Sequence, residues 1–187
     1  MPRAGLSEAR VVDEAEQLSD EVGLSRLTLA AVAERLGVRQ PSLYKHIEGM
    51  AGLHRSISIR AKAELAEILG RAAVGRSGDD AIWSMAIAYR TWAVQHPGRY
   101  EAAQRAPQPG DVDDERVSAA AVAVLADVLA GYELRGDDAI DAIRALRSAL
   151  HGFVTLQASG GFGLPVDVDR SYERMVAGLV AGFAGGR

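Results

Sequence analysis

Apolar residues recur at helical spacing along almost the whole chain, and no stretch of useful length alternates apolar and polar residues as a half-buried β-strand does. In segment 29–36, the apolar residues fall at i, i+3, i+4 and i+7 and define one buried helix face. Glycines and prolines separate the segments. The sequence therefore predicts an all-α protein of about nine helices, over residues 8–22, 29–36, 41–47, 53–69, 80–96, 100–105, 115–132, 137–159 and 169–183.

Local signals set the expected ends of these helices. The residues suited to N-cap and post-helix positions are Ser7, Thr28, Gly23 and Gly37. We expect Gly49 and Gly52 to break the chain before residue 53, and Pro97-Gly98 to end the preceding helix. Because segment 115–132 is rich in Ala and Val, we expect that helix to be largely buried.

Composition excludes several classes of protein. The chain has 187 residues, with 21 basic and 25 acidic side chains, a balance that excludes a histone-like polycation. The absence of cysteine excludes a disulfide scaffold, a thiolate zinc site and a cysteine nucleophile. The four histidines are dispersed, so we expect no metal site and no cofactor. No run approaches the roughly 20 apolar residues of a membrane span, and the first eight residues lack an apolar signal core. We therefore expect a cytoplasmic protein that has no contact with membranes.

The charge is unevenly distributed. Residues 8–21 hold six acidic side chains and one arginine, whereas residues 26–60 hold six basic side chains and only two acidic ones. A local excess of positive charge can lie against phosphates, although the same pattern is also typical of a solvated helix face. Charge alone does not decide between the two.

A helix-turn-helix pattern occupies residues 28–47. Segment 28–36 is the expected supporting helix, Gly37-Val38-Arg39 the turn, and Gln40–His46 the helix that would enter the major groove of DNA. Leu43 and Ile47 lie four residues apart and can anchor this second helix to the core. The polar side chains beside them can bind base edges and phosphates. Spacing alone also fits an ordinary helical hairpin.

The run from Leu29 to Ile47 resembles the DNA-binding domain of the TetR family of transcriptional repressors. The resemblance extends over about residues 7–60 and is specific in residues 28–47. The resemblance implies a homodimer in which residues 1–52 bind double-stranded DNA and residues 53–187 bind a small-molecule inducer and form the dimer. The DNA contacts that it implies, with Arg39 added, are Thr28, Arg39, Gln40, Pro41, Ser42, Tyr44, Lys45 and His46. Arg39 stands where the family often has Ser, and it could add a base or phosphate contact. Met50 stands where the family often has Lys, so one phosphate contact is in doubt.

Residues 141–183 resemble a TetR subgroup that shares an aromatic-His-Gly signature and a following Gly-Phe-Gly-Leu-Pro loop. Here the signature is Leu150-His151-Gly152, without the aromatic residue, and the loop is 161–165. The resemblance implies that the last two helices form a four-helix bundle with those of a second chain. The small and apolar residues suited to that interface are Ala149, Gly152, Val176, Leu179, Val180 and Phe183. The same stripe would equally suit the core of a single chain.

Polar and aromatic residues within the later helices are candidates for a ligand pocket, since pockets are mostly apolar with a few placed polar groups. They are Trp83, Tyr89, Trp92, His96, Tyr100, His151, Phe153, Gln157 and Phe162. An all-α enzyme acting through His151 and His96 is a rival hypothesis, but no spacing places these groups within hydrogen-bond reach. A dimeric helical adaptor without DNA affinity is another. The sequence favours a ligand-responsive repressor with no catalytic residues.

Overall fold

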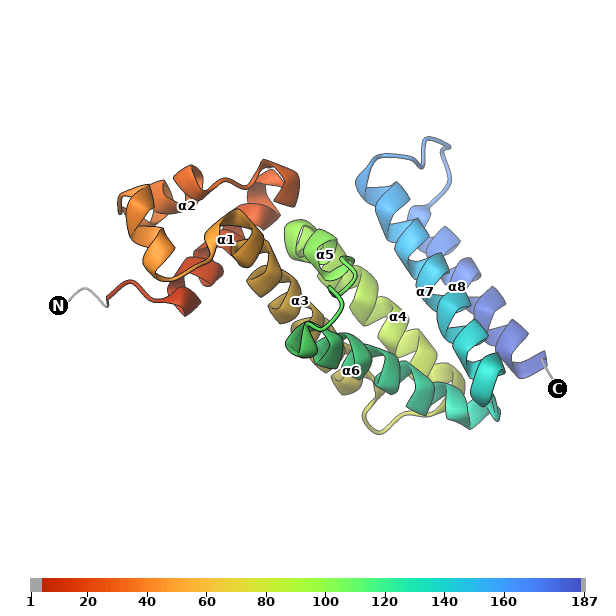
Figure 1. Cartoon of the computed structure of the whole chain (residues 1–187). Helices are drawn as coiled ribbons and strands as arrows, with labels where there is room; N and C mark the ends of the chain where they lie inside the picture. The colour runs from red at the N-terminus through yellow and green to blue at the C-terminus, as the bar shows by residue number, and fades with distance from the viewer. Residues whose placement is uncertain (1–4, 186–187) are drawn as a thin grey trace. The chain divides into compact units, whose positions relative to one another are not determined.

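The computed structural model describes residues 5–185, and it is all-α throughout that range (Figure 1). Residues 1–4 and 186–187 lie outside the described residues, and so does part of the segment in which no signal core is expected. The elements are α1 (Glu8–Val22), η1 (Leu24–Arg26), α2 (Leu29–Leu36), η2 (Gln40–Lys45), α3 (Gly49–Ala73), α4 (Gly78–Gln95), α5 (Pro97–Ala103), α6 (Val112–Leu129), η3 (Ala130–Tyr132), α7 (Gly136–Ala158) and α8 (Val168–Gly185). The all-α prediction is confirmed.

Two expectations about these helices are wrong, and one helix begins earlier than expected. Gly49 does not break the chain but begins α3 with φ 66°, and Gly52 lies inside that helix. Helix α4 does end before Pro97, at Gln95, as expected, but α5 begins at Pro97 and not at residue 100, because a proline is well tolerated where no backbone N–H is needed. Helix α6 is largely exposed within the single chain, with Val122 47% exposed.

The described chain forms two compact units. The first contains the residues up to Ala63 together with Gln95–Val117, and the second contains Glu64–Val94 together with the residues from Ser118 onward. Helix α3 therefore begins in the first unit and ends in the second. The expected domain boundary after residue 52 falls inside this helix and stays an expectation. No single described helix is both long and apolar enough to span a membrane; only the pair Val112–Tyr132 and Gly136–Ala158 reaches that length and composition together, across a bend of 114°.

The core of the first unit is built from the helices that the periodicity predicts. The Ser7 hydroxyl accepts a hydrogen bond from Arg10 N, and the Thr28 hydroxyl accepts one from Ala31 N, so both act as N-caps. The apolar faces of α1 and α2 meet in a cluster that also takes in residues of η2 and α3, including Val11, Val32, Leu43, Leu53 and Ile57.

Helix α5 is held against α1 by a backbone contact and an ion pair. A Cβ atom on Gly98 would lie 2.1 Å from the Ser19 carbonyl oxygen, so only glycine allows this approach. One residue further on, Asp20 accepts hydrogen bonds from Arg99 N at 2.9 Å and from Arg99 Nε at 2.8 Å. Contacts between residues almost 80 positions apart in the sequence thus join α5 to α1 within the first unit.

In the second unit, α7 and α8 lie side by side (Figure 1) and bury a common apolar face. The Tyr172 hydroxyl of α8 donates a hydrogen bond to the Ala86 carbonyl of α4 at 2.6 Å. At the other end of α8, the Phe183 ring packs edge-on against Tyr132 with 5.9 Å between centroids. These two contacts fix α8 to the rest of its unit.

We expect Gly98→Ala to destabilise the protein by about 1–3 kcal/mol, because the added methyl group would overlap the Ser19 backbone. The thermal unfolding midpoint, followed by circular dichroism, measures the effect. Gly70→Ala is the matched control: its new Cβ would meet only a Val124 methyl group at 3.9 Å. That variant should keep or raise stability, by about 1 kcal/mol of helix propensity. Equal stability of the two variants would contradict the close approach.

Candidate nucleic-acid interface

The turn between α2 and η2 is a tight, glycine-dependent connection. Gly37 ends α2 in the left-handed region, with φ 67° and ψ 32°. The N–H of Val38 donates to the Ala33 carbonyl at 3.0 Å, which satisfies a carbonyl at the end of α2. The chain then turns through Arg39, whose carbonyl accepts a hydrogen bond from Ser42 N at 2.9 Å. The expected second helix is present, but it is a 3-10 helix.

Burial of Leu43 fixes which side of η2 faces outward. Leu43 is 0% exposed and Ile47 7% exposed, so both anchor the segment to the core as the spacing predicts. Tyr44 is 56% exposed. Among the other residues expected to bind DNA, Arg39, Gln40, Pro41 and Lys45 are exposed, and Ser42 and His46 are half-buried. Thr28 is exposed at the start of α2, where its hydroxyl also serves as the N-cap.

Most other arginines of the first unit are neutralised by acidic residues of the same chain. Arg35 binds Glu14 at 2.6 Å and Glu21 at 2.5 Å, and the hydrogen bond between Arg35 and Glu21 holds the pKa of that carboxyl below its ordinary value. Arg60 binds Asp13 at 2.6 Å and Glu16 at 3.0 Å. The acidic run of residues 8–21 therefore supplies counter-ions within the unit.

Arg39 and Lys45 differ from these arginines. Neither has an ion-pair partner among residues 5–185. Both flank the buried Leu43, together with the hydroxyl groups of Ser42 and Tyr44 and the Gln40 amide. Proteins bind phosphates and base edges through cations that have no acidic partner of their own and through hydrogen-bonding side chains beside them.

Helix α3 carries polar contacts to the segment that precedes and begins α6. Arg55 binds Asp111 through two hydrogen bonds of 2.6 Å, which hold the pKa of the Asp111 carboxyl below its ordinary value. Lys62 and Asp114 form a buried ion pair at 2.5 Å, with both side chains 7% exposed. These pairs join residues more than 50 positions apart, so local sequence patterns do not reveal them.

Two further polar groups of α3 are buried without a hydrogen-bond partner in the described part of the chain. They are His54 Nε2 and Ser58 Oγ, one helical turn apart. Burial lowers the pKa of His54, and the nearby Arg105 guanidinium lowers it further, while Glu101 acts in the opposite sense. The folded protein therefore favours neutral His54.

The nine candidate pocket residues are divided between the two units. His96 and Tyr100 belong to the first unit and the other seven to the second. His96 Nδ1 lies 3.3 Å from an Asp20 carboxylate oxygen and 2.5 Å from Arg99 Nη2, so it takes part in the contact between α1 and α5. In the second unit, Phe153 and Phe162 pack with 4.7 Å between ring centroids, while Trp83 and His151 are half-buried and Tyr89 and Trp92 buried.

Sequence reasoning missed the residue that organises part of this second group. Arg90 of α4 donates a hydrogen bond to the Gln157 side chain at 2.9 Å and lies over the rings of Phe153 and Tyr172. The sequence signal that could have pointed to Arg90 is a single arginine in an otherwise apolar helical pattern. Within residues 5–185, no three histidine, cysteine or acidic side chains gather to hold a metal ion.

The residues expected at a dimer interface separate into two groups. Val176, Val180 and Phe183 are 0%, 7% and 9% exposed, so they lie in the core of the single chain. Their burial favours the alternative that this stripe belongs to the core of a single chain, and their part in a dimer interface stays a prediction. Ala149, Gly152 and Leu179 are half-buried and remain candidates.

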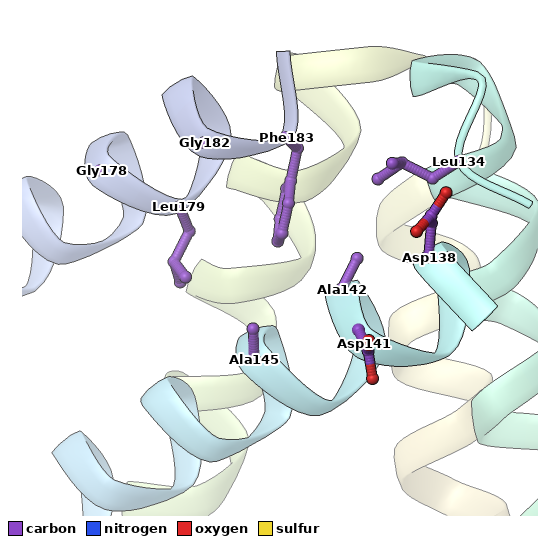
Figure 2. Close-up of a pocket in the computed structure, with 9 residues that line it drawn as sticks. All are labelled: Leu134, Asp138, Asp141, Ala142, Ala145, Gly178, Leu179, Gly182 and Phe183. Atoms are coloured by element: carbon purple, nitrogen blue, oxygen red, sulfur yellow. The ribbon is translucent and has the colours of Figure 1, made fainter. Parts of the chain in front are cut away.

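A shallow groove adjoins one of these candidates. Figure 2 shows Gly178, Leu179 and Gly182 of α8 facing α7, and the space between them has a volume of about 430 Å³. No heavy atom lies within 4 Å of the Cβ position of either glycine, so backbone is open to contact there. The remaining lining residues are Leu134, Asp138, Asp141, Ala142, Ala145 and Phe183.

The first unit thus has the structure of a helix-turn-helix head, which defines a class of DNA-binding regulators. Comparison with known proteins agrees. Residues 11–57 match the model of bacterial regulatory proteins of the tetR family, and residues 82–179 match the model of the tetracyclin repressor-like C-terminal domain. The chain belongs to the TetR family and is a transcriptional regulator with a helix-turn-helix and a C-terminal ligand-binding domain.

Relatives and solved structures cover nearly the whole chain. The uncharacterized HTH-type transcriptional regulator Rv0681 of Mycobacterium tuberculosis is 41% identical over 96% of this chain and 83% of its own length. YobS, another such regulator, from Bacillus subtilis, is 34% identical over 97% of this chain and 95% of its own. A TetR variant of Acinetobacter baumannii, solved in complex with minocycline, is 25% identical over 96% of this chain and 97% of its own, with a TM-score of 0.71.

The environment of His54 predicts a pH-dependent stability. An unfolded histidine takes up a proton near pH 6.5, whereas the folded chain resists protonation of His54, so the unfolded state binds more protons below that pH. The free energy of unfolding should fall as the pH drops from about 7 toward the folded pKa. His54→Gln should lessen this fall, measured by urea unfolding across that range. An identical pH dependence in both proteins would contradict the role assigned to His54.

Proposed function

We propose that this regulator is a repressor that binds a palindromic operator in double-stranded DNA as a homodimer and is released by a small-molecule inducer. The observation that carries the proposal is the pair of uncompensated cations, Arg39 and Lys45, on either side of the buried Leu43. A dimer would place two such segments in successive major grooves, roughly 34–36 Å apart. The protein would act in the cytoplasm, where its operator is accessible.

The residues proposed to contact the operator have distinct tasks. Arg39 and Gln40 stand at the start of η2, where bidentate side chains can bind guanine and adenine edges. Ser42, Tyr44 and Lys45 can bind phosphate oxygens. Thr28 and His46 complete the set, at the start of α2 and just after η2, and Pro41 fixes the backbone of the first turn.

Inducer release requires that the ligand binds the two states of the dimer with different affinity. Helix α3 is the continuous element that begins in the first unit and ends in the second, so a change in the second unit can reach the first through it. The related TetR variant was solved in complex with minocycline, which supports a small-molecule ligand for this chain too.

Two other functions make different predictions. An adaptor without DNA affinity would show no gel shift on DNA from the promoter of its own gene, at any salt concentration. An enzyme acting through His151 and His96 would turn over a small molecule. The repressor should instead shift a palindromic fragment, with an affinity that falls steeply as salt rises.

Lys45→Ala should weaken operator binding and reduce the salt dependence of log Kd by about one unit, because one phosphate contact is lost. Tyr44→Ala should weaken binding as well. The folded state should be unaffected, since both side chains are exposed. Fluorescence anisotropy at several salt concentrations measures the effect.

The matched control for this experiment is Arg71→Ala, which removes an exposed cation paired with Glu67 in the second unit. It should bind the operator as the wild-type protein does. If Tyr44→Ala and Lys45→Ala also bind normally, the DNA-reading segment lies elsewhere.

Arg39→Ser should relax or change the preferred base at one position of each half-site, at a cost of roughly 1–3 kcal/mol if Arg39 binds guanine through two hydrogen bonds. Selection from a randomised operator pool, performed with both proteins, measures the preference. Recovery of one consensus with equal stringency would show that Arg39 is only a solvated turn residue.

Leu179→Glu should yield a folded monomer that no longer binds the palindrome, because a carboxylate in the proposed α8 seam would be buried without a partner. Sedimentation with circular dichroism measures both properties. Val74→Glu, which places the same charge on a residue that is 73% exposed, is the control and should stay dimeric. A Leu179→Glu protein that dimerises and binds DNA normally would place the interface elsewhere.

A further inference from the structure

Arg90 is a largely buried cation in the second unit. Its side chain is only 16% exposed although it carries a charge, and it lies in an apolar helix between aromatic residues. The guanidinium carbon is 4.7 Å from the Tyr172 ring centroid and 5.6 Å from that of Phe153. Such stacking orients the planar guanidinium and leaves its N–H groups to point outward at the ring edges.

The counter-ion of Arg90 is itself exposed. Asp169, in the first turn of α8, accepts a hydrogen bond from Arg90 Nη2 at 2.7 Å, yet its side chain is 76% exposed. Gln157 accepts from Nε, and no hydrogen bond from Nη1 is found among the described residues. A carboxylate arriving from solvent could therefore replace Asp169 on the guanidinium without opening a buried ion pair.

An aromatic ring from an exposed loop packs on Phe153, one of the two rings beside Arg90. Phe162, 37% exposed, packs on Phe153 with 4.7 Å between the ring centroids. It belongs to residues 160–167, all of which are exposed. Three glycines, Gly160, Gly161 and Gly163, lie beside it in this loop.

A carboxylate on Arg90 and a ring on Phe153 are thus both supplied by exposed side chains of the same chain. We propose that Asp169 and Phe162 occupy a binding site for an aromatic carboxylate, and that such a ligand takes their places on Arg90 and Phe153. This inference rests on the proposed function, in that it names the chemical class of the inducer. Displacement of Asp169 and Phe162 would alter the start of α8 and the loop before it.

The test uses 1-naphthoate as the probe and isothermal titration of the full chain in the absence of DNA. The wild-type protein should bind 1-naphthoate at least tenfold more tightly than 1-naphthamide, which keeps the ring and lacks the charge, and than hexanoate, which keeps the charge and lacks the ring. Arg90→Met should lose at least tenfold in affinity, because the charge-assisted hydrogen bonds are gone.

Asp169→Asn gives the sharper result, since it removes the competitor and leaves Arg90 intact. It should bind 1-naphthoate about threefold to tenfold more tightly than the wild-type protein, and Phe162→Ala should also bind more tightly. Asp141→Asn is the matched control: Asp141 is likewise 76% exposed and paired with an arginine, Arg144, and its replacement should leave the affinity unchanged.

Several results would overturn the proposal. The first is equal affinity of the wild-type protein for 1-naphthoate and 1-naphthamide. The second is an Asp169→Asn variant that binds 1-naphthoate no more tightly than the wild-type protein, and the third is that neither of these two proteins binds 1-naphthoate. A lower melting temperature of Asp169→Asn without tighter binding would show that the Arg90 cluster is a structural contact only. Operator binding is measured separately, so a protein that binds DNA but not 1-naphthoate contradicts this inference and leaves the proposed function standing.

Discussion

Helix α1 is the element on which the first unit depends, because one of its faces forms part of the apolar core and another supplies acidic counter-ions. Its apolar face packs against α2 and the start of α3, and its acidic face binds Arg35 and Arg60. Its last turn holds α5 through Ser19 and Asp20. Arg39 and Lys45, by contrast, have no acidic partner among residues 5–185 and remain available to an external anion. The net charge of −4 is therefore no obstacle to binding a polyanion.

The helices were predictable because their signals are local. Apolar periodicity, N-caps such as Ser7 and Thr28, and the glycine at position 37 all act within a few residues of the structure that they determine. The errors at Gly49 and Gly52 arose where a glycine lies at the start of a helix or inside a helix that packing supports. Tertiary contacts there outweigh the local preference.

The candidate DNA-binding segment could be found from spacing and resemblance, but its electrostatics could not. Which cations are neutralised depends on pairs such as Arg60 and Asp13, which lie 47 positions apart. The same holds for Arg90, whose role depends on rings from α7 and α8. Periodicity likewise could not say whether the stripe on α8 faces its own chain or another one, because both surfaces require the same apolar spacing. The contact with Ala86 and the burial of Val176 assign most of that stripe to its own chain.

The buried pair of Lys62 and Asp114 has a consequence for how this sequence can diverge. Loss of either member leaves the other as an unneutralised charge in a nearly dry site, at a cost of about 3–5 kcal/mol, whereas replacing both by apolar residues can be neutral. A protein with a single substitution at either position should therefore fold poorly, so the two positions can change readily only together. Two residues separated by 52 positions, one on α3 and one on α6, should therefore tolerate substitution only as a pair.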